Sequence, residues 1–374
     1  MRDQSPITPS ELACPRCGRP LAVEGAVWVC GEHGEVGSMS ADGIATFDRS
    51  DAYWGEVDRD LMRKILAKTR EAGWREALES ELRPHHPELF EYVHHLSRGD
   101  WMVLLPLDRR STVAVDIGAG WGPNSLALAP HVARVYSVEK TAERIGFLAA
   151  RAHQDEVTNL IPVRADLHAL PIAPSSVDVI VVNGVLEWAG LVDPDADRVR
   201  RRNPKILQEL FLRQLWRLLK PGGHLYVGIE NRFGRMFLQG TPDHQGLAYT
   251  SLMPRALART YTALRSITSS RTHRVERDYR TYTYSYGGYD RLLRSCGFAN
   301  VRRYGVMPGY NIPTRIVPLE TNGPSVYFSR RERSPQGLRG RLRRAVHLAM
   351  AATGLQARLS SCFAIVAERG PEEE

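Results

Sequence analysis

The chain lacks several features that would assign it to a specialised class of protein. No segment approaches the roughly 18 consecutive apolar residues that a membrane-spanning helix needs. The first residues, MRDQSPITPSELACPRCG, lack the apolar core of a signal peptide. No internal repeat is visible, and 43% apolar with 25% charged residues is an ordinary globular composition. We therefore expect a globular chain of 374 residues with a cytoplasmic location as the default.

Cysteine is also scarce: the chain has five. Cys14, Cys17 and Cys30 lie close together near the start, and the other two follow far away at Cys296 and Cys362. An odd number with this distribution argues against a disulfide framework. It favours a local metal site in a reducing compartment.

The N-terminal cysteines belong to a C-x2-C-x12-C-x2-H pattern formed by Cys14, Cys17, Cys30 and His33. Each pair lies in a turn rich in Pro and Gly, CPRCG or CGEHG, and is able to bind one side of a tetrahedral ion. Because four protein ligands leave no position for water, the pattern predicts a structural Zn²⁺ that stabilises a small module. The alternative is three unrelated buried thiols beside a surface histidine.

Composition divides the chain into regions. Residues 1–50 are Gly-rich, with the strand-like segments LAVEG and VWVC, and residues 51–110 show the periodicity of a helical cap. From 111 to 370, short apolar runs alternate with helical stretches, which predicts an α/β domain: βαβ units with a parallel sheet and helices on both faces. Residues 231–285 interrupt this rhythm as a loop-rich insertion with many tyrosines. The expected strands read TVAVDIG, RVYSVEK, LIPVRAD, VDVIVVN, GHLYVGIE, VRRYGVM and CFAIVAER.

Glycines at alternate positions follow the first strand of this α/β region. In VAVDIGAGWGPNS, Asp116 precedes Gly118, Gly120 and Gly122 where the strand turns into a helix. Glycine there allows positive φ and lets a ligand approach bare backbone N–H groups. A glycine loop alone is weak evidence, since dehydrogenases use a G-x-G-x-x-G variant for a pyrophosphate.

The order D-x-G-x-G-x-G resembles the first motif of class I S-adenosylmethionine-dependent methyltransferases. Glu139, at the end of the second strand, matches the family's acid that accepts hydrogen bonds from both ribose hydroxyls. Asp166 and Leu167 match the acid and the backbone N–H beside the adenine, and LLKPGGHLYVGIEN resembles the approach to the fifth strand. The resemblance implies a Rossmann-like sheet of seven strands with S-adenosyl-L-methionine as cofactor. The implied cofactor-binding residues are Asp116, Gly118, Gly120, Gly122, Glu139, Asp166, Leu167 and Asn183.

The N-terminal region resembles the zinc-ribbon-like start of certain bacterial methyltransferases, in which C-P-x-C-G leads to D-G-I, here Asp42-Gly43-Ile44. The usual fourth ligand in that pattern is cysteine, whereas this chain has His33. The segment IENRFGRMFLQGTPDHQG resembles the region after the fifth strand in a subgroup associated with glycan and secondary-metabolite gene clusters.

A general base is expected after the fifth strand, because the carboxyl ends of strands form the crevice of an open α/β sheet. His244, beside Asp243, is the best candidate, since an imidazole that is neutral near pH 7 accepts a proton from a hydroxyl. A surface loop histidine is the alternative. Tyr286 is the third catalytic candidate because Tyr282, Tyr284 and Tyr286 would share one side of an extended segment. The alternative is an edge strand with half its tyrosines in the core. Further residues expected on the rim are Asn183, Glu187, Glu230 and Asn231.

The net charge is +8 with a pI of about 9.3, which permits an anionic partner. The basic runs at 198–205 and 330–344 would suit phosphates, a lipid surface or RNA, although such runs are more often solvated faces. A helix near 337–353 has a basic start and an apolar later half. It fits a peripheral membrane contact, but we favour a crossover helix before the last strand.

These observations predict a methyltransferase that acts on a small-molecule, sugar or glycan-type acceptor, at oxygen. The alternative is a ribosomal or other RNA base methyltransferase with a zinc-bearing recognition module. Against that alternative, the aromatic N-P-P-Y type tetrapeptide of many base methylases is absent after the fourth strand, which reads NGVLEW. The acceptor and the oligomeric state are left open by the sequence.

Overall fold

The computed structural model describes residues 11–191, 203–268, 279–331 and 337–370. Among these residues, no helix is both long and apolar enough to cross a membrane. Most of the basic run at 198–205, and residues 332–336 of the run at 330–344, lie outside the described residues.

Contacts along the chain define two compact units. The first consists of Met1–Val182, Arg213–Leu225 and Glu368–Glu374, and the second of Asn183–Leu212 and Tyr226–Ala367.

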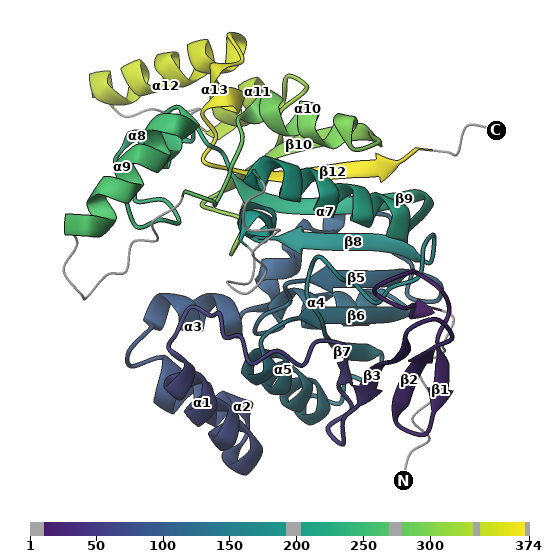
Figure 1. The fold of residues 1–374 in the computed structure, drawn as a ribbon. Helices are drawn as coiled ribbons and strands as arrows, with labels where there is room; N and C mark the ends of the chain where they lie inside the picture. Colours follow the sequence, from purple (N-terminus) through teal and green to yellow (C-terminus); the bar gives the residue numbers. More distant parts are fainter. Residues whose placement is uncertain (1–10, 192–202, 269–278, 332–336, 371–374) are drawn as a thin grey trace. The chain divides into compact units, whose positions relative to one another are not determined.

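Buried parallel strands organise the first unit (Figure 1). Strand β5 (Val113–Ile117) pairs in parallel with β6 (Arg134–Glu139) and with β8 (Val177–Asn183). Strand β7 (Leu160–Arg164) pairs in parallel with the far side of β6. All residues of β5 are buried, as expected for a continuous apolar run that is covered on both faces. The carboxyl ends of these strands therefore lie at one edge of the sheet.

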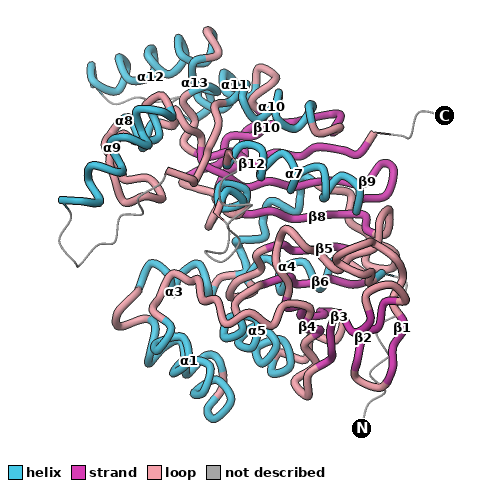
Figure 2. The backbone as a smooth tube through the Cα atoms, viewed as in Figure 1, coloured by secondary structure: helices cyan, strands magenta, loops and turns pink. Residues whose placement is uncertain are grey.

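The cysteine-bearing region adds antiparallel strands to the same sheet (Figure 2). They are β1 (Ala22–Glu24), β2 (Val27–Cys30), β3 (Gly34–Met39) and β4 (Ala45–Thr46). Each pairs with the next, and β4 then pairs in parallel with β7. Hydrogen bonds from the N–H groups of Phe47 and Asp48 to the Arg164 carbonyl, 2.8 and 3.1 Å long, continue this junction.

Helices of the region 51–110 pack against the helices that follow β5 and β6. The first unit contains the α-helices α1 (Arg59–Ala72), α2 (Trp74–Ala77), α3 (Pro87–His94), α4 (Pro123–Leu128) and α5 (Ala142–Gln154). It also contains the π-helix η2 (Leu78–Leu82) and the 3-10 helices η3 (Leu96–Leu104) and η4 (Ala129–His131). The Asp58 side chain caps α1 by accepting a hydrogen bond from Leu61 N at 2.9 Å. Met62 and Ile65 of α1 share one core with Trp121 and Phe147. This core fixes the predicted helical cap beside the glycine loop.

The second unit has its own strand order, β9-β12-β10-β11. These strands are β9 (Leu219–Glu230), β10 (Phe298–Met307), β11 (Arg315–Pro318) and β12 (Cys362–Arg369), of which β9 begins and β12 ends in the first unit. Its helices and turns are η5 (Leu186–Gly190), α7 (Pro204–Leu218, shared with the first unit), α8 (Arg235–Leu238), η6 (Thr250–Leu252), α9 (Arg255–Thr268), α10 (Tyr286–Ser295), α11 (Gly323–Arg331), α12 (Gly337–Ala352) and α13 (Leu355–Arg358).

The insertion after β9 contains a helix that the sequence did not predict. Helix α9 buries Ala258 and Thr262 on one face, and Ala258 packs against Tyr279 and Tyr282. Tyr279 and Tyr282, which the sequence analysis assigned to a loop-rich insertion, therefore form a small core with this helix.

The predicted α/β fold is confirmed. All seven expected strands are present, as β5 to β10 and β12, and the segments LAVEG and VWVC contain β1 and β2. Strands β3, β4 and β11 were not predicted. They are short or rich in glycine and polar residues, so they carry little apolar periodicity.

Candidate functional site

The glycine loop after β5 requires glycine for reasons internal to the protein. Gly118, Gly120 and Gly122 have φ of +68°, +56° and +89°. A Cβ on Gly120 would lie 2.2 Å from Arg144 Nη2, and one on Gly122 would lie 2.0 Å from a Leu148 methyl carbon. The expectation that ligand approach alone explains these glycines is therefore incomplete, because α5 side chains fill the space beside two of them.

Glu139, at the end of β6, is in direct contact with this loop. Its Oε2 accepts a hydrogen bond from Gly120 N at 3.1 Å, and its Oε1 accepts one from Thr141 N at 2.8 Å. Arg144 Nη1 lies 3.8 Å from the same carboxylate. A buried acid is thus held against the bare backbone of the loop.

Asp116 lies within β5 and supports the loop from inside. Its side chain is 1% exposed, and its Oδ2 accepts a 2.6 Å hydrogen bond from Ser125 Oγ of α4. Burial raises the pKa of Asp116 to about 6, although the hydrogen bond from Ser125 opposes that shift. The carboxylate therefore connects the strand to the helix across the loop.

Asp166 follows β7, next to Leu167. Its carboxylate accepts hydrogen bonds from Lys140 Nζ at 2.7 Å and from His168 N at 2.8 Å. Burial alone would raise the pKa of Asp166, but these hydrogen bonds and the Lys140 charge hold it below its usual value. Asp116, Glu139 and Asp166 thus lie at or near the carboxyl ends of three adjacent strands, as the sequence predicted. Asn183 belongs to the second unit, where its Oδ1 lies 1.9 Å from the position that a Cβ on Gly228 would take.

Two side chains beside the loop, Glu56 and Arg144, were not predicted from the sequence. Trp121 Nε1 donates to Glu56 Oε2 at 3.1 Å, and Arg144 Nη2 donates to the other oxygen of Glu56 at 3.3 Å. The Arg144 guanidinium also lies 5.3 Å from the ring centre of Trp54. The segment before α1 therefore contributes to the surroundings of the loop.

The predicted metal ligands meet in the N-terminal region. Cys14 Sγ and Cys30 Sγ each lie 3.6 Å from His33 Nδ1, and Cys17 Sγ lies 3.6 Å from Cys30 Sγ. All four ligand atoms lie within 4.8 Å of one another, and the cysteines are free thiols. A tetrahedral ion with Zn–S bonds of about 2.3 Å has ligand separations of about 3.6 to 3.8 Å. The donor set and its spacing fit Zn²⁺, and His33 lies where a fourth ligand would be needed.

Three ionisable side chains form a second, buried cluster in the second unit. Glu187 of η5 and Glu230 of β9 flank His244, whose Nε2 lies 3.8 Å from Glu187 Oε1 and 3.3 Å from Glu230 Oε2. Tyr310 donates a 2.8 Å hydrogen bond to Glu230 Oε1, and the Trp188 ring lies 4.7 Å from the imidazole centre. The ligand atoms of the three charged residues lie within 4.8 Å of one another, a donor set that also suits a divalent cation.

The protonation of His244 differs from the sequence-based expectation of a neutral imidazole near pH 7. Burial alone would lower its pKa, but the carboxylates of Glu230 and Glu187 more than offset burial and raise it to about 9. At neutral pH the side chain is therefore an imidazolium between two carboxylates. Its neutral form becomes abundant only in alkaline solution.

The other catalytic candidates have different surroundings from those predicted. Asp243 accepts hydrogen bonds from Ser251 Oγ at 3.1 Å and from Tyr279 OH at 3.2 Å, so it stabilises the loop that carries His244. Tyr286 begins α10, and the Arg303 guanidinium lies 3.8 Å from its ring centre.

The tyrosines do not line one side of an extended cleft, because the helix capped by Ser285 begins at Tyr286. Tyr282 is buried, with the Arg255 guanidinium 3.3 Å from its ring centre. Tyr284 donates a 2.7 Å hydrogen bond to Gln208 Oε1. Nor does the rim residue Asn231 project toward a ligand, since its amide donates to two backbone carbonyls of the segment before β12.

The part of the chain that carries the glycine loop and the three acids is similar to a known protein family. Residues 115–227 match the protein family described as a methyltransferase domain. They form a methyltransferase domain. The predicted enzyme class is confirmed at the level of this domain.

The methyltransferase domain also has a curated relative. The chain is 32% identical over 123 residues to the biotin biosynthesis bifunctional protein BioHC of Cellvibrio japonicus (strain Ueda107). The match covers 33% of this chain and 20% of that protein, so the chain spans about a fifth of its relative's length.

Solved structures resemble the chain only distantly. Phosphoethanolamine N-methyltransferase 2 of Haemonchus contortus, in complex with phosphomonomethylethanolamine and S-adenosylhomocysteine, has a TM-score of 0.42 and 12% identity, over 85% of this chain and 62% of that one. A complex of the Haloferax volcanii Trm112 methyltransferase activator with a methyltransferase has a TM-score of 0.41 and 15% identity, and the match covers 77% of this chain and 94% of that one. Likeness at this level carries no argument about cofactor or acceptor.

Proposed function

We propose that the protein transfers the methyl group of S-adenosyl-L-methionine to a hydroxyl oxygen of a small-molecule, sugar or glycan-type acceptor. The observation that supports the cofactor is the contact between the Glu139 carboxylate and Gly120 N, inside the methyltransferase domain. This contact places a buried anion beside bare backbone, where a ribose with two hydroxyl donors would be bound.

In this proposal the sulfonium cofactor supplies an already activated methyl group. Glu139 accepts hydrogen bonds from the ribose, while Asp166 and the Leu167 N–H bind the adenine. Asp116 and Ser125 hold the glycine loop in shape. Water exclusion and alignment are the main tasks left to the protein.

A hydroxyl acceptor must lose its proton when its oxygen is methylated, and the cluster of Glu187, Glu230 and His244 provides a proton acceptor. A neutral His244 is a strong base because its conjugate acid has a pKa of about 9. Both carboxylates stabilise the imidazolium that results. With this pKa, only about 1% of His244 is neutral at pH 7, so turnover limited by this step should rise about tenfold per pH unit up to pH 9.

The cofactor assignment is tested by calorimetry with S-adenosylhomocysteine on the full chain. Glu139→Gln removes the charge that accepts the ribose hydrogen bonds, each of which contributes on the order of 1.5 to 3 kcal/mol. We expect the dissociation constant to rise at least tenfold. Glu88→Gln, an exposed glutamate in the first turn of α3, is the matched control and should leave binding unchanged.

An unchanged dissociation constant in Glu139→Gln would contradict the ribose assignment. Thermal unfolding of both variants separates binding from loop stability, because Glu139 also accepts the Gly120 and Thr141 N–H groups. If the wild type itself fails to bind, the cofactor proposal is wrong.

We also propose that Cys14, Cys17, Cys30 and His33 hold a structural Zn²⁺. The support is the distances between their ligand atoms and the absence of a position for water among four protein ligands. The ion would stabilise the turns that precede and follow β2.

A further inference from the structure

We propose that helix α12 is a peripheral anchor that binds the surface of a bilayer containing anionic phospholipid. The inference does not depend on the proposed methylation. It rests on which side chains this helix turns toward solvent.

One exposed face of α12 is apolar. Leu338, Leu342 and Val346 are 81%, 65% and 48% exposed, and Ala345 and Ala349 of the same helix are also exposed. At 3.6 residues per turn, these positions lie within about 100° around the helix. Amphipathic helices of globular proteins normally turn such a stripe toward the core. Although α12 precedes β12 as a crossover helix would, its apolar stripe is not used for packing against the described part of the chain.

Positive charge accompanies this stripe. Arg339 and Arg341 are exposed, and α12 contains four arginines in total. No acidic residue occurs from 337 to 367, so nothing on this segment neutralises them. A basic helix with an apolar face lies in the plane of a membrane interface, with leucines in the acyl boundary and arginines at the phosphates.

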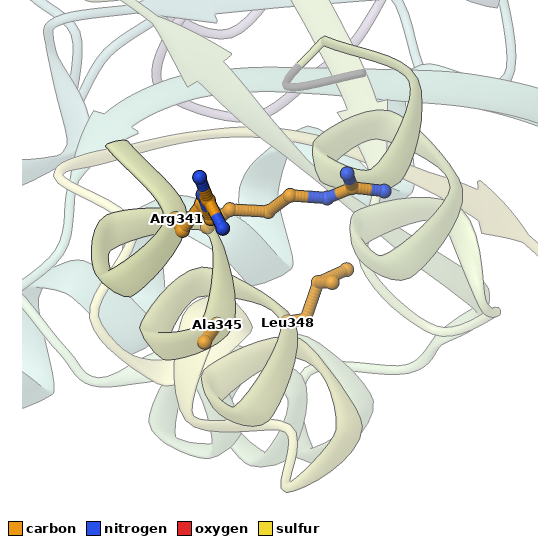
Figure 3. A pocket seen from close by; sticks show the side chains of 4 residues that line it. Arg341, Ala345 and Leu348 are labelled. Atoms are coloured by element: carbon orange, nitrogen blue, oxygen red, sulfur yellow. The ribbon is translucent and has the colours of Figure 1, made fainter. Parts of the chain in front are cut away.

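A hollow beside the stripe has the same mixed character (Figure 3). It has a volume of about 430 Å³ and is lined by Arg341, Arg344, Ala345 and Leu348. Arg344 Nε is buried without a hydrogen-bond partner among the described residues. Guanidinium groups beside alkyl side chains suit a phosphate attached to a hydrocarbon, which is the chemistry of a phospholipid headgroup region.

Other occupants fit this face less well. A second copy of α12 would cover the stripe, but it would bring eight arginines together with no acid on either helix. Nucleic acid would pair with the arginines, but it would leave Leu338 and Leu342 in water. An anionic bilayer satisfies both the charge and the apolar surface.

The test is cosedimentation of the full chain with vesicles. We expect binding to vesicles of phosphatidylcholine and phosphatidylglycerol at 7:3, weaker binding at 500 mM than at 100 mM NaCl, and little binding to phosphatidylcholine alone. The double variant Leu338→Gln/Leu342→Gln should lower the partition coefficient at least tenfold, since each leucine loses its burial in the acyl boundary. Glutamine has nearly the helix propensity of leucine, so α12 should persist, which circular dichroism checks.

Two further variants complete the design. Arg339→Gln/Arg341→Gln should weaken binding to anionic vesicles and reduce its salt dependence. Val103→Gln is the matched control, because Val103 is 83% exposed in the first unit, and it should bind as the wild type does.

Three results would overturn the proposal. The first is no binding of the wild type to anionic vesicles, and the second is equal binding by the leucine variant. The third comes from sedimentation velocity without lipid: a wild-type dimer that becomes monomeric in Leu338→Gln/Leu342→Gln would show that the stripe joins two copies of the chain.

Discussion

Replacing Glu230 by glutamine should lower the pKa of His244, which tests whether the Glu230 charge is what raises it. The two side chains are linked by a 3.3 Å contact between Nε2 and Oε2, and the Glu230 side chain is 10% exposed. Glutamine keeps nearly the same shape and a hydrogen-bond acceptor but removes the negative charge. The perturbation therefore isolates the electrostatic contribution.

The magnitude follows from Coulomb's law and the geometry. Two unit charges 3.3 Å apart interact by about 5 kcal/mol at an effective dielectric constant of about 20. One pKa unit corresponds to about 1.4 kcal/mol, and the hydrogen bond that glutamine keeps offsets part of the loss. We expect the pKa of His244 to fall from about 9 by at least about 2 units.

The same shift contributes to stability. A pKa raised from 6.5 to about 9 corresponds to about 3 kcal/mol for the imidazolium form. Because the folded-state pKa is the higher one, this stabilisation is complete below about pH 6.5 and is lost as pH rises to 9. The wild-type free energy of unfolding should fall over this window, and Glu230→Gln should flatten that dependence.

The assay is an NMR titration of the imidazole Cε1–H signals. The chain has 12 histidines, so the His244 signal is assigned by its loss in His244→Gln. Asp243→Asn is the matched control, since Asp243 lies next in sequence but contributes least among the named causes of the raised pKa. A wild-type pKa near 6.5, or a value in Glu230→Gln within half a unit of the wild type, would refute the reasoning.

Two other predictions concern the loop and the metal. Gly122→Ala adds a methyl group 2.0 Å from a Leu148 side-chain carbon at φ +89°, so it should lower the free energy of unfolding by about 1 to 3 kcal/mol. Chemical denaturation measures this, and a free energy of unfolding equal to that of the wild type would contradict the close contact. We expect metal analysis of the wild type to find one equivalent of zinc, and Cys14→Ser should lose it and loosen residues 1–50 while α1 to α5 stay folded. A wild type without zinc would exclude the assignment.

The features that the sequence predicted best are those with a pattern among neighbouring residues. The strands from β5 to β10 have strong apolar runs, and the cysteine and histidine spacing identified the cluster of Cys14, Cys17, Cys30 and His33. Glu139 was predicted from the resemblance to class I methyltransferases, and the structure places it at the end of β6 beside Gly120.

Contacts between distant segments were beyond the sequence. Glu56 reaches Trp121 across 65 positions, and the carboxylates that set the charge of His244 come from η5 and β9. Helix α9 was missed because its burial depends on Tyr279 and Tyr282, which follow it in the chain. These contacts and this burial depend on tertiary packing between distant segments, which leaves no periodic pattern in a single sequence.

The junction between β4 and β7 has a consequence for how the cysteine-bearing region is connected to the proposed cofactor pocket. Lys140 lies 3.8 Å from Asp48, just past β4, and 2.7 Å from Asp166, the residue proposed to bind adenine. One lysine thus joins the end of the cysteine-bearing region to the acid that is proposed to bind adenine, so Lys140→Met would separate these two segments without changing a proposed ligand of either zinc or cofactor.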